Sequence, residues 1–159
     1  MAGGVNGADV SLVAVAEAEY EDFFAMLEAY DRELQAYETV QPDNEVEFAT
    51  YRQAILDDME GRELLWIVKG EDRAGFVMTR SSTDWPDGDP IMSIAEFYVV
   101  PHRRRNGVGR AAVEALLAEH RDRGTFLVQA SIMRENKAAR DFWARLGFEV
   151  QFLQTSRRP

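Results

Sequence analysis

The residue types best suited to chemistry in this chain stand in a short basic turn, Arg104-x-x-Gly107-x-Gly109. The apolar, β-branched and aromatic run before it, 91–100, predicts a strand, and apolar residues at helical spacing after it predict a helix over 108–121. Unpaired N–H groups and the dipole at a helix start attract anions, and glycine lets a phosphate approach the backbone closely. The spacing matches neither nucleotide fingerprint, Gly-x-Gly-x-x-Gly or the phosphate loop. The turn therefore indicates an anion site, with a plain strand-to-helix turn as the alternative.

The elements that must position this turn follow from hydrophobic spacing and from glycine and proline breaks. Strands two to four are joined by short turns and must be antiparallel, whereas the fourth and fifth, joined through a helix, run parallel if they are neighbours. The order β-α-α-β-β-β-α-β-α-β predicts an α/β (α+β) domain whose mixed central sheet is flanked by helices. We expect helices over 17–38, 45–60, 108–121 and 136–146, and strands over 9–15, 64–69, 74–81, 91–100, 125–132 and 148–155.

Length and composition narrow the class of protein. The chain has 159 residues, 46% of them apolar and 29% charged, so it can bury a sizeable core. We expect one domain over 9–159, after a flexible N-terminus at 1–8. No apolar run approaches about 18 residues, so no transmembrane helix is expected. Without cysteine, the chain can have no disulfide, thiolate metal site or cysteine nucleophile; we expect no metal, and the composition fits a cytoplasmic protein.

The charges are divided unevenly along the chain. The net charge of −10 argues against a nucleic-acid partner. Residues 16–63 contain 15 acidic and 3 basic residues, a net of −12, whereas residues 102–159 contain 12 basic and 6 acidic residues, a net of +6. One interpretation is two solvated faces of opposite sign. The other is an acidic side for a cationic substrate and a basic side for a phosphorylated cofactor, and the two are compatible.

A second motif lies about thirty residues after the turn, Asn136-x-x-Ala139-x-x-Phe142-Trp143-x-x-x-Gly147-Phe148. Together with the turn and the order of elements, it resembles the GNAT superfamily of acyl-CoA-dependent N-acyltransferases. In that family the segment reads Asn-x-x-Ala-x-x-Phe-Tyr-x-x-x-Gly-Phe. The resemblance covers about 64–148, whereas the two N-terminal helices agree only in position and length.

The resemblance implies acetyl-CoA as the acyl donor and CoA as the product. The turn would wrap the pyrophosphate with backbone N–H groups, and the pantetheine arm would pair with the strand at 97–100. Asn136 would lie beside the arm where the fourth and fifth strands splay apart; its alternative is a plain helix N-cap. We expect cofactor contacts from Phe97, Val99, Arg104, Arg105, Asn106, Gly107, Val108, Gly109, Arg110, Asn136 and Trp143.

The chemistry that the resemblance implies is direct transfer of the acyl group to an amine. The amine must lose a proton, and a backbone N–H of the fourth strand could stabilise the oxyanion. Our candidate base is Glu96, the only carboxylate in that strand. Pleating puts Glu96 and Tyr98 on one face and Phe97 and Val99 on the other, so only one set faces the thioester unless a bulge resets the alternation. The alternatives are a carboxylate paired with a cation, and a water relay to an acid on the N-terminal helices.

One residue departs from the family pattern. Trp143 stands where the family has the tyrosine that serves as general acid toward the leaving thiolate. An indole N–H donates a hydrogen bond but is not a proton donor at neutral pH. Three outcomes follow: the thiolate leaves without a protein acid, Tyr98 substitutes as the acid, or catalysis is weak. We favour the first, because an ordinary thiol has a pKa of about 8.5 and its thiolate is a tolerable leaving group.

These observations leave three functions open. The first is an N-acetyltransferase acting on the primary amine of a cationic small molecule, with a peptide amine as another acceptor. Tyr30 or Tyr37, expected in the core, could instead line a pocket. The second is a non-catalytic acyl-CoA-binding or sensing module of the same fold, and the third is a nucleotide-binding domain. Dimers are common in the family, so the resemblance also raises the question of a homodimer.

Overall fold

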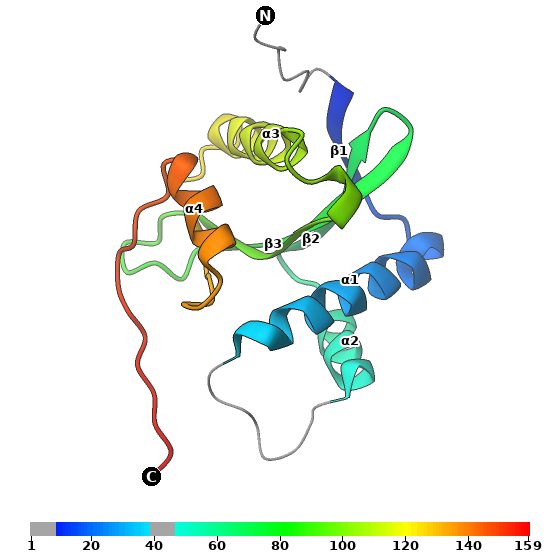
Figure 1. The fold of residues 1–159 in the computed structure, drawn as a ribbon. Coiled ribbons are helices and arrows are strands. Elements are labelled where there is room, and N and C mark those ends of the chain that lie inside the picture. Colours follow the sequence, from blue (N-terminus) through cyan, green and yellow to red (C-terminus); the bar gives the residue numbers. More distant parts are fainter. Residues whose placement is uncertain (1–8, 39–46) are drawn as a thin grey trace, which may run out of the picture.

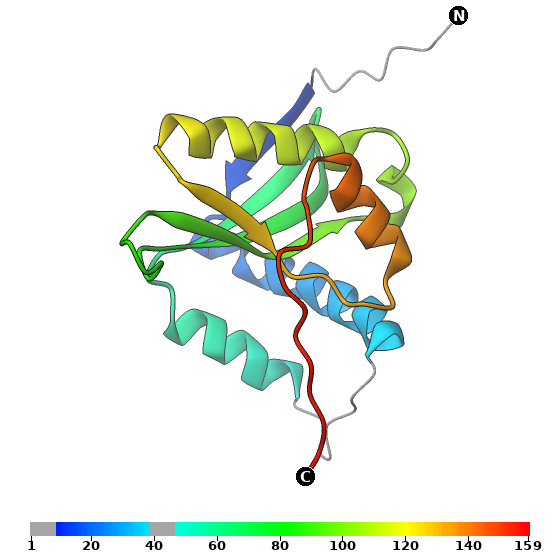
Figure 2. The same ribbon diagram turned by 90° about the vertical axis from the view of Figure 1, so that its left-hand side faces the viewer.

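The computed structural model describes residues 9–38 and 47–159, which form a twisted five-stranded sheet with helices on both faces (Figure 1). Helices α1 and α2 cover one face, and α3 and α4 cover the other (Figures 1 and 2). The strands are β1 (Val10–Ala14), β2 (Arg62–Lys69), β3 (Asp72–Ser82), β4 (Ile91–Val99) and β5 (Leu127–Ala130). The helices are α1 (Tyr20–Leu34), α2 (Phe48–Asp57), α3 (Val108–Asp122) and α4 (Lys137–Arg145), and short 3-10 turns span Glu17–Glu19, Gln35–Tyr37 and Pro101–Arg103.

The strands lie in the sheet in chain order, β1-β2-β3-β4-β5. Strands β2, β3 and β4 pair antiparallel through the short connections at 70–71 and 83–90. Strand β1 also pairs antiparallel with β2, across a connection that carries α1 and α2, and β4 and β5 are parallel. This confirms the predicted mixed sheet, the antiparallel second to fourth strands, and the parallel fourth and fifth strands. No helix in the described part of the chain is long and apolar enough to cross a membrane.

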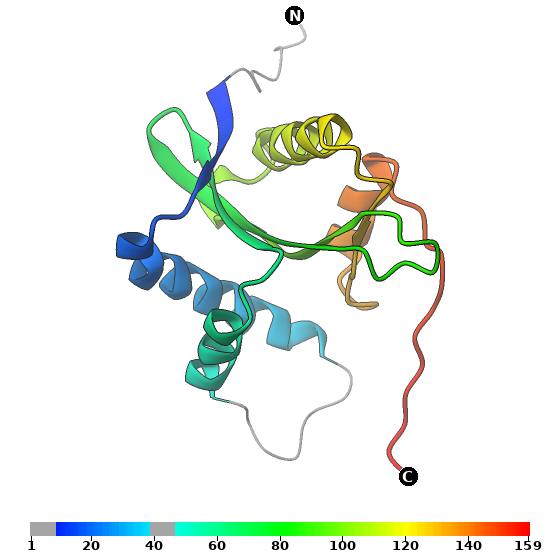
Figure 3. The same ribbon diagram turned by 180° about the vertical axis from the view of Figure 1, so that it is seen from behind.

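Each face of the sheet has its own apolar core, because successive strand residues point to opposite faces. Beneath α1 and α2 the core is largely aromatic, and its rings meet edge to face, Phe23 with Trp66 and with Phe76. Beneath α3 and α4 the core is mostly aliphatic, with Val77, Met92 and Leu116 fully buried or nearly so. Figure 3 shows α1 and α2 together beneath the sheet, where an ion pair between Arg52 and Glu21 joins them.

The predicted last strand is wrong. Residues 148–155 are extended but pair with no strand in the described structure, and they run away from the sheet (Figure 2). Val150, Phe152 and Leu153 are 79%, 79% and 84% exposed. Their alternating apolar pattern predicted a strand, but a strand exists only where another strand accepts its hydrogen bonds, and the sequence pattern says nothing of that partner.

Several predicted boundaries also change. The helix predicted over 17–38 begins and ends with a 3-10 turn, so only its central part, α1, is α-helical. The second helix is shorter than predicted and spans Phe48–Asp57. The first two residues predicted for this helix, and the N-terminus predicted to be flexible at 1–8, lie outside the described residues.

Candidate functional site

Strand β4 has two halves with different neighbours. From Ile91 to Ile94 it pairs with β3 on one side and with β5 on the other, where Ile94 faces Ala130. Beyond Ile94 only the β3 side is paired. Val100 donates its N–H to Ala74 of β3, so by the two-residue alternation Phe97 and Val99 turn their backbone groups toward the open side. The second half of β4 therefore presents a free edge.

A β-bulge separates the two halves. Met78 of β3 pairs with Glu96 and Thr79 pairs with Ile94, so Ala95 has no partner in the register. A bulge shifts the alternation of side chains by one residue. Ile94 consequently packs into the core beneath α3 and α4, while Glu96, two residues later, faces α1 and α2.

A cavity of about 810 Å³ opens beside the free edge. Its walls come from α1 and the turn after it, from β4, from the turn before α3, and from the segment that leads into α4. Ten of the predicted site residues line it: Glu96, Phe97, Val99, Arg104, Arg105, Gly107, Gly109, Arg110, Asn136 and Trp143. Tyr98, Asn106 and Val108 are not among the described residues that line it.

The turn before α3 has the backbone geometry that a helix N-terminus needs for anion binding. Gly107 is the N-cap, with a left-handed φ of 75°, a conformation that favours glycine. Ala111 donates the hydrogen bond to the Gly107 carbonyl that closes the first helical turn, so the N–H groups of the residues between them are available. Arg105 also has a positive φ of 66°, and its side chain is exposed.

Gly109 has a packing role as well. A Cβ built there would lie 3.2 Å from the ring of Phe142 in α4 and 3.6 Å from a methyl group of Val99. The glycine therefore lets α4 and β4 approach the start of α3. This contact joins the two sequence motifs physically, since Phe142 belongs to the second of them.

The arginines of the turn are largely engaged with the protein itself. Arg104 donates through Nε to the Val99 carbonyl at 2.7 Å and pairs through Nη2 with the Glu33 carboxylate, at 2.8 Å to Oε2. Arg110 pairs with Glu114 one turn later in α3, at 2.9 Å. Arg105 makes no ion pair with any described residue and is the cation most available to a phosphate.

Glu96 lies partly buried between the sheet and the two N-terminal helices. Tyr51 of α2 donates its hydroxyl to Glu96 Oε1 at 2.6 Å. Burial raises the pKa of the Glu96 carboxyl above its ordinary value, and hydrogen bonds from Tyr51 and Tyr30 act in the opposite direction. A carboxylate whose pKa is raised is a stronger base once ionised, which suits a group that must remove a proton.

Tyr98 is tied to the α1 side of the molecule. Its hydroxyl donates to Glu33 Oε1 at 3.1 Å, and the Arg104 guanidinium lies 5.2 Å from the centre of its ring. Burial first, and the Glu33 carboxylate next, raise the pKa of Tyr98. Its role as a substitute acid stays a prediction. To protonate a leaving thiolate, the Tyr98 hydroxyl would first have to give up its hydrogen bond to Glu33.

The second motif combines helix capping with core packing. Asn136 accepts a hydrogen bond from the Ala139 N–H at 3.1 Å, so it is the N-cap of α4 and at the same time a cavity residue. Trp143 is 6% exposed, and its ring centre lies 5.3 Å from that of Phe97 and 4.9 Å from that of Phe148. Most of the Trp143 surface is therefore core, with one part on the cavity.

Sequence reasoning missed two residues of this region. Glu33 lines the cavity, and Tyr51 holds Glu96, but the sequence marks both only as members of an amphipathic helix. The alternative for Tyr30 and Tyr37 is confirmed, since both line the cavity. Nothing in the spacing of Tyr51 separates a core tyrosine from one that contacts a carboxylate 45 residues away.

The sequence from residue 20 to residue 148 matches the model of the acetyltransferase (GNAT) family. A comparison with curated protein sequences finds no match.

Solved structures of several differently named proteins have the same fold. A ribosomal-protein-alanine N-acetyltransferase from Brucella melitensis biovar Abortus 2308 is similar with a TM-score of 0.72 and 16% identity, over 94% of this chain and 98% of that one. An aminoglycoside acetyltransferase from an uncultured soil metagenomic sample is similar with a TM-score of 0.70 and 13% identity, over 97% of this chain and 99% of that one. A transcriptional regulator from Bacillus halodurans C-125 is similar with a TM-score of 0.70 and 21% identity, over 94% of this chain and 99% of that one. At these identities the likeness shows the fold and nothing finer.

Proposed function

The chain belongs to the GNAT family of acetyltransferases, and from that premise we propose that it is an N-acetyltransferase. It moves an acetyl group from acetyl-CoA to the primary amine of a cationic small molecule and leaves CoA as the second product. One observation supports this most directly. A single cavity is lined both by the Glu96 carboxylate and by the glycine turn at the start of α3, so a base and an anion site share one space.

Three features of the chain suit acetyl-CoA. The available N–H groups at the start of α3 suit its phosphates, and the left-handed Gly107 keeps a Cβ out of that approach. The free edge of β4 at Phe97 and Val99 suits the amides of the pantetheine arm, although Arg104 now takes the Val99 carbonyl. When bound, acetyl-CoA supplies an acetyl thioester that an amine can attack.

The base in this proposal is Glu96. An ammonium ion has no lone pair, so the acceptor must lose a proton before or while its nitrogen forms the new bond to the acetyl carbon. The carboxylate takes that proton directly or through one water, and the bond from the acetyl carbon to sulfur breaks. The backbone N–H groups of Phe97 and Val99, on the free edge, are the candidate donors to the oxyanion.

No protein acid is needed for the leaving group in this proposal. An ordinary thiol has a pKa of about 8.5, so a thiolate is a tolerable leaving group in neutral water. Trp143 then serves as packing beneath the cavity rather than as a replacement for the family's tyrosine.

The acceptor side favours an amine with a positive charge and some apolar surface. Tyr30, Leu34 and Tyr37 supply the apolar wall, and Glu33 and Glu96 supply carboxylates. Among the described acids of residues 16–63, Glu33 alone lines this cavity, and others pair elsewhere, such as Glu21 with Arg52 and Asp22 with Arg73. In this proposal the preference for a cation falls to Glu96 and to Glu33, whose carboxylate also pairs with Arg104, rather than to the whole acidic half of the chain. Among the similar structures, the aminoglycoside acetyltransferase was crystallised with sisomicin.

The second candidate function is a non-catalytic module that binds acyl-CoA. Two observations favour it: Trp143 replaces the family's acid, and the hydroxyl of Tyr98 is committed to Glu33. Such a module would keep the glycine turn before α3 and the free edge of β4, but it would not catalyse acetyl transfer.

Release of free thiol from acetyl-CoA, measured across a panel of amines, separates the two functions. The panel contains polyamines, aminoglycosides, amino acids and short peptides. We expect release with a cationic small-molecule class, and release at least about 100-fold slower with the Glu96→Gln variant. Tight acetyl-CoA binding by calorimetry without release in any class would favour the binding module. A homodimer and a cytoplasmic location stay predictions, which sedimentation and microscopy of a tagged chain can test.

A further inference from the structure

Tyr51 stands behind the candidate base rather than in the cavity. It belongs to α2, its hydroxyl donates to Glu96 Oε1 at 2.6 Å, and it is not among the described residues that line the cavity. A substrate in that cavity would meet Glu96 and not Tyr51. Any influence of Tyr51 on the reaction must therefore pass through the carboxylate that it holds.

The hydrogen bond has a fixed direction. Burial first, and the Glu96 charge next, raise the pKa of Tyr51 above its ordinary value, so the phenol keeps its proton throughout the working range. An ionised carboxylate can only accept hydrogen bonds. Tyr51 is therefore a donor whenever Glu96 is a base, and the bond is strongest in that state.

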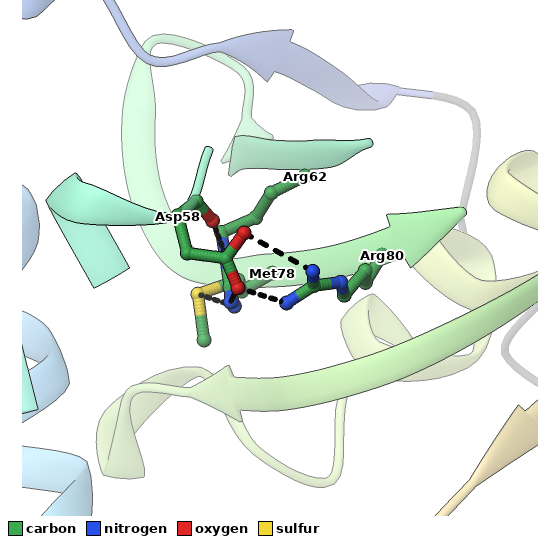
Figure 4. A network of polar contacts seen from close by, with 4 residues as sticks. All are labelled: Asp58, Arg62, Met78 and Arg80. Carbon is green, nitrogen blue, oxygen red and sulfur yellow. Dashed lines mark hydrogen bonds and ion pairs between the residues drawn. The ribbon is translucent and has the colours of Figure 1, made fainter. Parts of the chain in front are cut away.

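Helix α2, which carries Tyr51, is held to the sheet at its C-terminal end by polar contacts of Asp58 (Figure 4). Asp58, the C-cap of α2, pairs with Arg80 at 2.5 Å and 3.1 Å, and its backbone carbonyl accepts from Arg62 Nε at 3.0 Å. Arg62 also contacts the sulfur of Met78 at 3.5 Å, and Met78 is the β3 partner of Glu96. Polar contacts thus hold the end of α2 one strand away from the base, which limits where the Tyr51 hydroxyl can go.

Other charged or titratable groups reach Glu96 from each element packed against it. From α1, the Tyr30 hydroxyl lowers the pKa of Glu96 and the negative charge of Asp31 raises it, and from β2 the positive charge of Arg62 lowers it. Burial outweighs the favourable members of this set, since the pKa of Glu96 remains above its ordinary value. Loss of the Tyr51 hydroxyl would remove the largest of the contributions that keep the carboxylate ionised.

We propose that Tyr51 is a positioning residue, whose hydrogen bond aims the Glu96 carboxylate into the cavity. This inference rests on the proposed acetyl transfer, in which Glu96 is the base. It connects α2, which contributes no described residue to the cavity wall, to the chemistry at the free edge of β4.

The test is Tyr51→Phe, which removes one oxygen and keeps the ring that packs against Phe48. Without that donor the pKa of Glu96 rises, so the acidic limb of the kcat/KM profile should move up by about one pH unit, equivalent to a tenfold loss below the limb. At higher pH, where Glu96 is ionised in both proteins, the loss should shrink. The KM for acetyl-CoA should stay the same. Tyr30→Phe should move the limb in the same direction by less.

The control is Tyr20→Phe, which removes a hydroxyl from a ring in the same core that does not contact Glu96. Its profile should overlay that of the wild type. A uniform loss at every pH in Tyr51→Phe, with an unmoved limb, would mean a purely structural role and would overturn the inference.

A second measurement does not depend on turnover. Carbon-detected NMR titration of the Glu96 carboxyl, assigned with Glu96→Gln, should give a higher pKa in Tyr51→Phe than in the wild type. An unchanged Glu96 pKa overturns the inference even if the enzyme is active. A raised Glu96 pKa in a protein that acetylates none of the amines upholds the contact while the proposed function fails, so the two failures can be told apart.

Discussion

The residues on the two faces of β4 contact different kinds of neighbour: short sequence motifs on one face, and single distant residues on the other. On the α3 and α4 side, Phe97 and Val99 meet residues from two short motifs, and the ring of Phe97 lies against those of Phe142 and Trp143. On the α1 and α2 side, Glu96 meets Tyr51 across 45 residues of sequence and Tyr30 across a longer stretch. The first side is built from local segments, whereas the second is built from single residues that meet only in the folded chain.

This difference suggests a division of labour. The α3 and α4 side carries the backbone features that suit acetyl-CoA, and the α1 and α2 side carries the carboxylates that suit an amine. Substitutions on one side should therefore affect acceptor chemistry and spare donor binding, and substitutions on the other side should do the reverse. Substitutions at four positions test that separation.

The largest effect is expected from Glu96→Gln on the acceptor side. Removal of a general base should lower kcat by about 100-fold or more, while the acetyl-CoA affinity stays within about twofold. Burial raises the folded-state pKa of Glu96, so the fold favours the protonated carboxyl, and that stabilisation is lost as the pH rises through the folded-state pKa. The neutral amide avoids this loss, and the unfolding temperature at pH 8 should not fall.

Calorimetry and thermal unfolding check both parts. A kcat within tenfold of the wild-type value would mean that Glu96 is not the base. Glu33, acting through a water relay, would then be the next candidate. A fall in acetyl-CoA affinity of more than tenfold would break the separation between the two sides.

The next effect is expected from Gly107→Val on the donor side. A Cβ in the left-handed region, which Gly107 occupies, is strained by about 1–2 kcal/mol, and we expect it also to obstruct the approach of a phosphate, so acetyl-CoA should bind at least about tenfold more weakly. The domain should still fold.

A matched control is Gly88→Val, since Gly88 has nearly the same φ, 74° against 75°, lies in the loop before β4, and has nothing within 4 Å of an added Cβ. It imposes the same kind of backbone strain without reaching the cavity. Equal acetyl-CoA affinity in the wild type and Gly107→Val would mean that the phosphates bind elsewhere.

A smaller effect is expected from Glu33→Gln. The variant removes one of the two carboxylates that face the acceptor and leaves Glu96 in place. Half-exposed charge pairs contribute up to about 1 kcal/mol, so the KM for a cationic acceptor should rise about three- to fivefold. Glu28→Gln, on the same helix but away from this cavity, should leave the KM unchanged. An unchanged KM in Glu33→Gln would show that the charge of the acceptor is recognised elsewhere.

The smallest effect on activity is expected from Trp143→Phe and Trp143→Tyr. Both keep an aromatic ring in the core, so kcat should stay within about twofold, and the lost packing should lower the free energy of unfolding by about 1–3 kcal/mol. Urea unfolding measures the second quantity. A tenfold rise in kcat for Trp143→Tyr alone would reveal that the leaving thiolate does use an acid, and that the wild-type chain lacks one.

The parts of the site that could be predicted share a physical property. The turn before α3 and the N-cap of α4 depend on residues within a few positions of each other, so glycine, proline and capping patterns report them directly. The strands β1 to β5 and all four helices were predicted for the same reason, with their ends displaced by a few residues. The extended tail at 148–155 shows the limit, because its apolar alternation carries no information about a partner strand.

The sequence by itself determined which elements form, in what order, and where the two motifs of the family stand. Only the tertiary structure decided that Ala95 bulges out of β4, and that bulge turns Glu96 away from the face of Ile94 and toward Tyr51. The reason is physical. Local pattern sets the energy of a turn or a helix, but the face of a side chain and its distant contacts depend on strand register and packing, which the whole chain determines together.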